Sequence, residues 1–245
     1  STGWMKAGTE QLTLSGSISN TNSGTVTVTA GRLHLAKTGG ARALASDVLL
    51  DGGVLILASS NQIAPTSNIS LVNQSSVFNG TGVNGGPAGV TQTLVSLSVA
   101  GGTFNSGSGS NWTITGALSF IGGTPASIYV GNSSSLLSAG SLSLIGMNKA
   151  SGSSLATPDN SFTIYGNNAS TQTTVTVGAG GLYLESSNIH MKRGSVANAK
   201  GSRLVLNGDV STGGATVSLI RRDGAEPLGE TVVELSGSAV DVDRT

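Results

Sequence analysis

A ten-residue pattern recurs along this chain and constrains the fold more than any other feature. Residues 26–35 read VTVTAGRLHL, which is two short runs of alternating apolar residues joined by Ala30 and Gly31. The pattern returns at residues 48–57 as VLLDGGVLIL and at residues 175–184 as VTVGAGGLYL. A strand–turn–strand unit repeated at a spacing of about 22 residues is typical of solenoids, whose units stack on one another.

The alternation within each unit indicates how such units bury a core. Val and Leu occupy the inward positions, and Thr, Ser or Asn occupy most outward positions. A single unit cannot close a core, but stacked units place like residues on like residues and form a continuous apolar column. We therefore predict an all-β parallel solenoid with 20–24 residues per coil and almost no helix. On the order of eleven coils, ~4.8 Å apart, would give a rod of roughly 50 Å.

The solenoid is expected to form one domain over residues 1–245, as a segment of a longer protein or as a stacking subunit. Loops are predicted to protrude near residues 79–90 and 147–160, where Gly, Asn and Pro replace the alternating pattern. The stretch 185–203, which clusters several basic residues, is predicted to be an exposed loop or edge. A sandwich of β-hairpins is the rival architecture, but its strands are usually ~5–6 residues long, longer than the runs seen in this chain.

Composition excludes several classes of partner and site. The chain has 12 basic and 12 acidic residues among 245, and this balance argues against nucleic acid and anionic membranes, which require a concentrated positive field. It has no cysteine, which excludes disulfide scaffolds and thiolate metal sites. No apolar run approaches the ~18 residues of a membrane span. The first residues lack the pattern of a signal peptide, so the chain is expected to be processed or a fragment.

Two segments of the chain resemble a known repeat. Residues 6–16 (KAGTEQLTLSG) and 25–35 (TVTVTAGRLHL) are similar to the autotransporter-associated β-strand repeat, whose pattern runs roughly KxGxGTLTLSG, a loop, then TTVNAGTLxLG. The similarity extends over residues 6–63 and 203–245. This resemblance implies a right-handed parallel β-helix in an exported bacterial protein, located at the cell surface or outside the cell.

The residue types that carry chemistry are sparse and scattered. The two histidines, His34 and His190, are more than 150 positions apart, and both are expected to face solvent from a strand or loop. The acidic residues are spread too thinly for the paired carboxylates of a carbohydrate-cleaving β-helix, among them Asp47, Asp51, Asp159, Asp209 and Asp223. The Gly-Gly turns lack the aspartate of calcium-binding β-rolls, and Asp241 and Asp243 resemble a solvated terminus. We predict no catalytic, cofactor or metal residues.

Surface contacts are the remaining source of function. Three aromatic and two basic residues are candidates for contacting a partner, namely Trp112, Tyr129, Tyr183, Arg221 and Arg222. The leading hypothesis is a non-enzymatic structural or adhesive solenoid, with host or matrix glycans as partners. One alternative is a filament subunit that stacks head to tail through uncapped terminal coils. The other is a carbohydrate-active β-helix.

Overall fold

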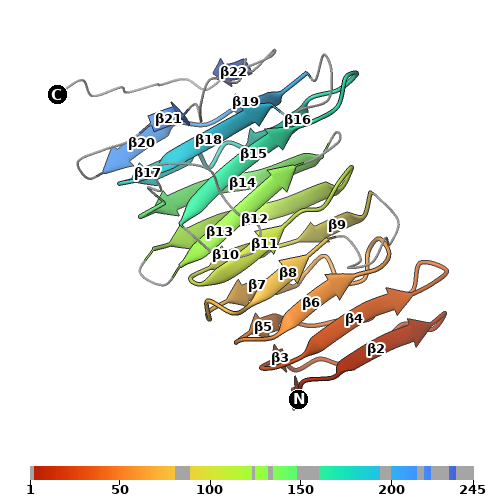
Figure 1. Cartoon of the computed structure of the whole chain (residues 1–245). Coiled ribbons are helices and arrows are strands. Elements are labelled where there is room, and N and C mark those ends of the chain that lie inside the picture. Colours follow the sequence, from red (N-terminus) through yellow and green to blue (C-terminus); the bar gives the residue numbers. More distant parts are fainter. Residues whose placement is uncertain are drawn as a thin grey trace.

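The computed structural model describes residues 3–80, 89–122, 125–131, 135–147, 160–193, 200–213, 218–221 and 232–235. Within these ranges every regular element is a β-strand (Figure 1). The same ranges contain no helix long and apolar enough to cross a membrane. The predicted loops near 79–90 and 147–160 lie mostly outside the described residues.

All strand pairs are parallel and form two sheets, one of 13 strands and one of nine. The path of the thirteen-stranded sheet runs through β1 (Trp4–Lys6), β3 (Val26–Val28), β5 (Val48–Leu50), β7 (Asn68–Leu71), β10 (Ser96–Val99), β12 (Asn111–Ile121), β14 (Leu136–Ile145), β16 (Thr173–Val177), β19 (Ser202–Leu206) and β22 (Val232–Leu235). Off this path lie β9 (Thr91–Leu94), β17 (Leu182–Glu185) and β20 (Val210–Gly213). The nine-stranded sheet runs through β2 (Gln11–Gly16), β4 (Arg32–Lys37), β6 (Val54–Leu57), β8 (Val77–Asn79), β11 (Gly102–Asn105), β13 (Ala126–Gly131), β15 (Ser161–Gly166), β18 (Asn188–Arg193) and β21 (Ser218–Arg221).

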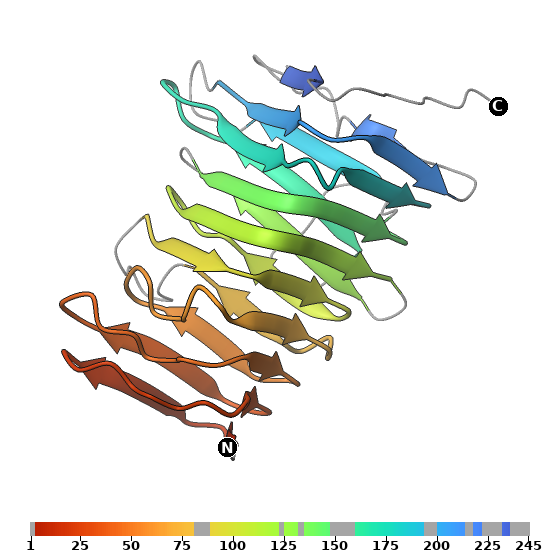
Figure 2. The same cartoon turned by 180° about the vertical axis from the view of Figure 1, so that it is seen from behind.

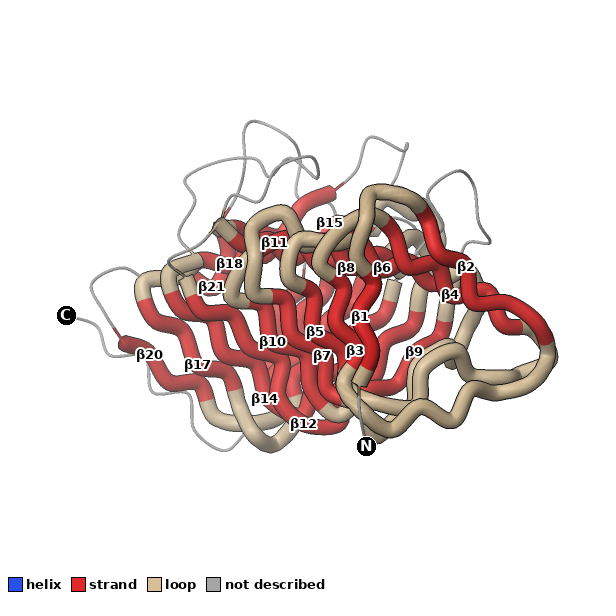
Figure 3. Tube along the Cα trace, turned by 90° about the horizontal axis from the view of Figure 1, so that it is seen from below, coloured by secondary structure: helices blue, strands red, loops and turns tan. Residues whose placement is uncertain are grey.

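The two sheets enclose a common core, and in the view from below their strands lie on opposite sides of the coil (Figure 3). Strands β12 and β14 each span two sides of the coil. The first half of β12 pairs with β9 and its second half pairs with β10. The first half of β14 pairs with β16 and its second half pairs with β17, and β12 and β14 also pair with each other. A register shift between Ile114 and Ala117 marks the corner of β12. The prediction of an all-β parallel solenoid is therefore confirmed.

The repeated pattern forms the core through like-on-like stacking. Val26 pairs with Val48, and Leu33 pairs with Leu55, and all four side chains are buried. Inward residues of successive coils continue these columns, so that the core runs along the whole stack. Full burial of each such side chain contributes about 1.5–3 kcal/mol, which is why strands of three or four residues persist in this setting.

The third copy of the pattern occupies a different corner of the coil. In the first copy, β3 lies in the thirteen-stranded sheet and β4 lies in the nine-stranded sheet, whereas the corresponding β16 and β17 both lie in the thirteen-stranded sheet. Alternating apolar residues flanking a glycine suit any corner of a solenoid. The pattern therefore predicts a corner without specifying which corner it is.

The number of coils is smaller than expected, because later coils are longer. Register steps of 22 residues join Val26 to Trp4 and Val48 to Val26, within the predicted 20–24. The step from Leu142 to Leu182 is 40 residues. Insertions between strands lengthen a coil without adding another one. The strands stack as a solenoid of about seven turns, so the expectation of about eleven coils was too high.

Two buried glutamines join neighbouring coils where strand pairing is absent. The side-chain amide of Gln62 donates to the carbonyl oxygen of Lys37 (3.2 Å) and its Oε1 accepts from the backbone N–H of Lys37 (2.8 Å). Gln92 makes the same pair of bonds with Ile63, at 2.9 Å and 3.2 Å. Each side-chain amide thus makes the pair of hydrogen bonds that a neighbouring strand would make. It satisfies a buried backbone N–H and C=O, which would cost free energy if they were left without partners.

Candidate functional site

One side of the thirteen-stranded sheet presents a straight column of hydroxyl-bearing residues to solvent, which we call the serine face. Successive register pairs align Ser70, Ser98, Ser119, Ser143, Tyr183 and Ser211. The column arises because β10 and β14 both contain Ser-Leu-Ser, and β7 and β12 also place a serine outward beside a buried apolar residue. The strands that carry it lie side by side in Figure 2 and Figure 3.

The serine face is flat and mostly uncharged. Strands β7, β10, β12 and β14 contain no Asp, Glu, Lys or Arg. An apolar row borders the column, where Val72 is 45% exposed and Ile121 is 50% exposed. Carboxylates lie at both ends, with Asp47 and Asp51 beside β7 at one end and with Glu185 on β17 and Asp209 before β20 at the other. The face therefore offers hydroxyls and apolar surface to a partner, with carboxylates at both ends.

A hollow of about 220 Å³ lies at the end of the serine face that carries Glu185 and Asp209. Its lining comes from three consecutive coils and consists of Ser141, Leu142, Ser143, Gly180, Gly181, Leu182, Tyr183, Asp209 and Ser211. The hollow exists because Gly180 and Gly181 put no side chain between the neighbouring strands. A Cβ on Gly181 would lie 2.5 Å from the backbone oxygen of Asp209, and its φ of 79° disfavours any other residue.

Tyr183 forms one wall of the hollow and is held in place by a carboxylate. Its hydroxyl donates a 2.6 Å hydrogen bond to Oε2 of Glu185, two residues along the same strand. This bond, followed by burial and by the charge of Glu185, raises the pKa of Tyr183 above its ordinary value. The hydrogen bond holds the ring of Tyr183 at the edge of the hollow.

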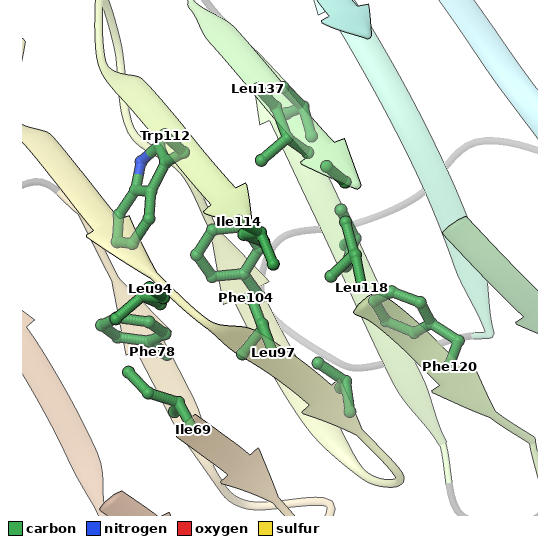
Figure 4. Close-up of a cluster of buried hydrophobic side chains, with 14 of the residues drawn as sticks. Ile69, Phe78, Leu94, Leu97, Phe104, Trp112, Ile114, Leu118, Phe120 and Leu137 are labelled. Carbon is green, nitrogen blue, oxygen red and sulfur yellow. The ribbon is translucent and has the colours of Figure 1, made fainter. Parts of the chain in front are cut away.

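Trp112, predicted as a surface contact, is buried in the core, so that prediction is wrong. Its indole Nε1 donates to the backbone oxygen of Ser106 at 2.8 Å. The ring makes edge-on contacts with Phe78 and Phe104, with centroids 5.3 and 5.0 Å away (Figure 4). Alternation with buried Ile114 on β12 places the indole on the inward side.

The other predicted contact residues do not meet Tyr183. Tyr129 lies on β13 of the nine-stranded sheet, where its ring packs against Tyr165 with centroids 5.7 Å apart. Burial, and secondarily the neighbouring Tyr165, raise the pKa of Tyr129. Arg221 ends β21, where only its backbone is described, and Arg222 lies outside the described residues. The candidate contacts are thus dispersed around the coil.

Both histidines were expected to face solvent, and this prediction is correct for His34 and wrong for His190. His34 lies on the outward side of β4 and is partly exposed. His190 is 2% exposed within β18, so the prediction of an exposed loop for this stretch is wrong there. Ile189 and Met191 alternate inward as core residues, and the outward side of the nine-stranded sheet is itself buried at this level, where Thr163 is 0% exposed.

The carboxylates support neighbouring coils individually. Oδ1 of Asp47 accepts hydrogen bonds from the backbone and side chain of Asn68, at 2.8 and 3.2 Å, and Asp51 accepts one from Asn73. Asp159, Asp223, Asp241 and Asp243 lie outside the described residues. Among the residues that the structure describes, no group of three or more His, Asp or Glu is placed to hold a metal ion.

Comparison with family models, curated proteins and solved structures returned no match for this chain. The solenoid shape alone does not identify the autotransporter-associated repeat family. The resemblance of residues 6–63 and 203–245 to that repeat therefore stands on the sequence motifs.

Proposed function

We propose that this chain is a non-enzymatic structural and adhesive solenoid of a bacterial cell-surface or secreted protein, and that its serine face binds glycans. The observation that carries the proposal is the in-register column from Ser70 to Ser211. Hydroxyls both donate and accept hydrogen bonds, as do the hydroxyls of a carbohydrate. A column held by continuous strand pairing is also preorganised, which lowers the entropic cost of binding an extended polymer.

The proposed location outside the cell rests on the repeat resemblance and suits the composition. Parallel stacking buries Val and Leu while leaving Ser, Thr and Asn outward, so the fold needs neither disulfides nor metals. A rod of stacked coils holds its binding face at a distance from the point where the protein is attached to the cell. These considerations favour the combined structural and adhesive role over a purely intracellular scaffold.

Retention on glycans tests the adhesive role. The purified chain is applied to a glycan array and to insoluble polysaccharides, and bound protein is measured. We expect retention by at least one neutral polysaccharide, and loss of retention when two charges are placed on the serine face by Ser98→Arg with Ser119→Arg. The matched control is Gln11→Arg with Thr13→Arg, which adds the same charge on exposed β2 of the other sheet.

Three outcomes would count against the proposal. No retention on any glycan would remove the adhesive role, and equal loss in both double variants would remove the serine face as the site. The non-enzymatic part is tested by incubating the chain with the same polysaccharides. New reducing ends or unsaturated products, absent from a heat-denatured sample, would contradict it.

End-to-end self-association is a second candidate, favoured by apolar exposure on the first coil. Met5 on β1 is 63% exposed and Leu12 on β2 is 39% exposed, and among the described residues β1 pairs only with β3 and β2 only with β4. An open parallel edge with apolar side chains is a template for another strand. Light scattering at increasing concentration tests this candidate, and a mass that stays at 24.2 kDa would contradict it.

A further inference from the structure

We propose that the hollow beside Tyr183 is a subsite for one uncharged sugar ring, and that its carboxylates exclude acidic sugars. This inference rests on the proposed adhesive function and specifies where a glycan is held most closely. It follows from the shape of the hollow, from the fixed tyrosine ring and from the charge at its rim.

The size of the hollow limits what it can hold. Sites for drug-sized ligands occupy about 300–1,000 Å³, so a hollow of about 220 Å³ suits a single ring of a longer chain. It opens onto the serine face, because Ser143 belongs to both the lining and the column. A polymer lying along the column therefore has a path by which one of its rings reaches the hollow.

Tyr183 supplies the apolar surface that a sugar ring requires. A tyrosine ring offers a large rigid contact at low entropic cost, and here the bond to Glu185 already fixes its orientation. The residue is partly exposed, so the ring is accessible from the hollow. The C–H face of a pyranose packs against such a ring, which gives the hollow an apolar contact as well as polar ones.

The polar rim determines the charge of the ligand. Ser141, Ser143 and Ser211 contribute hydroxyls that donate and accept. Asp209 lies in the lining and Glu185 holds the tyrosine, and both carboxylates only accept hydrogen bonds when ionised. Sugar hydroxyls satisfy these acceptors, whereas a uronate or sialate carboxylate is repelled by them.

The test is a titration followed by two-dimensional ¹H–¹⁵N NMR of the whole chain. Methyl β-glucopyranoside, methyl β-galactopyranoside and the methyl glycoside of glucuronic acid serve as probes. We expect at least one neutral glycoside to shift the amides of residues 180–183 and 209–211, with a dissociation constant on the order of 1–10 mM for a single ring. The glucuronide should bind at least about fivefold more weakly, and Asp209→Asn should narrow that difference.

Variants of Tyr183, at the wall of the hollow, distinguish binding in a defined subsite from non-specific binding. Tyr183→Ala should weaken binding at least tenfold, whereas Tyr183→Phe, which retains the ring, should stay within about threefold of the parent. Thr13→Ala, at an exposed position on β2 of the other sheet and outside the hollow, is the control and should leave binding unchanged. Circular dichroism of each variant verifies that the fold is retained.

The outcomes distinguish the subsite from the adhesive role. The subsite is refuted if no neutral glycoside shifts these amides at 50 mM, roughly five times the weakest expected dissociation constant, or if Tyr183→Ala binds like the parent. Polysaccharide retention that is lost in the serine-face double variant but unaffected by Tyr183→Ala supports adhesion and refutes the subsite. Amide shifts without any polysaccharide retention support the subsite and refute the adhesive role.

Discussion

Replacing Trp112 with alanine should be among the most damaging single changes in this chain. The side chain is 0% exposed, and its ring contacts Phe78 and Phe104 edge-on. Removing a buried aromatic side chain costs about 3–5 kcal/mol, and the carbonyl of Ser106 would also lose its hydrogen-bond donor, at about 1 kcal/mol. The backbone also packs tightly against the indole, since a Cβ on Gly80 would lie 2.7 Å from Cζ2 of Trp112.

The expected loss is therefore about 4–6 kcal/mol, a large fraction of the ~5–15 kcal/mol by which domains are stable. Urea unfolding followed by circular dichroism measures it, with Trp112→Phe as an intermediate step costing about 1–2 kcal/mol. Met5→Ala, at a 63% exposed position, is the control and should change stability by less than about 0.5 kcal/mol. A loss below about 1 kcal/mol for Trp112→Ala would refute the assignment of this residue to the core.

Other perturbations test separate parts of the structure. Gln62→Leu removes both bonds to the backbone of Lys37 and should cost about 2 kcal/mol in urea unfolding, whereas no cost would show that these bonds are dispensable. Gly102→Ala places a Cβ 2.3 Å from a backbone oxygen at a φ of 91° and should prevent normal stacking, while Gly40→Ala, with open space around it, should cost only about 1 kcal/mol of backbone strain in the same assay. Because the pKa of Tyr129 is raised in the folded chain, the unfolded chain loses its phenolic proton at lower pH, and the free energy of unfolding should fall above about pH 10. Tyr129→Phe should remove about one proton from the pH dependence of the free energy of unfolding. An unchanged pH profile in this variant would contradict the prediction.

The sequence was sufficient to predict the solenoid because its information is local. Val26 and Val28 alternate with threonine, Gly31 marks the corner, and stacking like residues is then the only economical way to bury them. The corner occupied by the third copy could not be predicted, since residues 175–184 satisfy the same local rules on any side of the coil. Register depends on the length of the insertions, and no local pattern encodes it.

The candidate site required the register and was missed for that reason. Tyr183 was recognisable as an outward aromatic residue, but its neighbours Ser143 and Ser211 are 40 and 28 positions away and meet it only through strand pairing. The pair Gly180-Gly181 was the available signal for a hollow next to an aromatic residue. Trp112 was misplaced although its alternation with Ile114 already indicated the inward side.

A distance along the serine face tests the central claim most directly. Ser70 and Ser211 are 141 positions apart in sequence but separated by five register steps, which at ~4.8 Å per step places them about 24 Å apart. Spin labels on Ser70→Cys with Ser211→Cys, in a chain that has no other cysteine, allow this distance to be measured by pulsed electron paramagnetic resonance. The account predicts a single narrow distribution centred at about 20–30 Å. A broad distribution, or one centred beyond about 40 Å, would contradict a continuous in-register face.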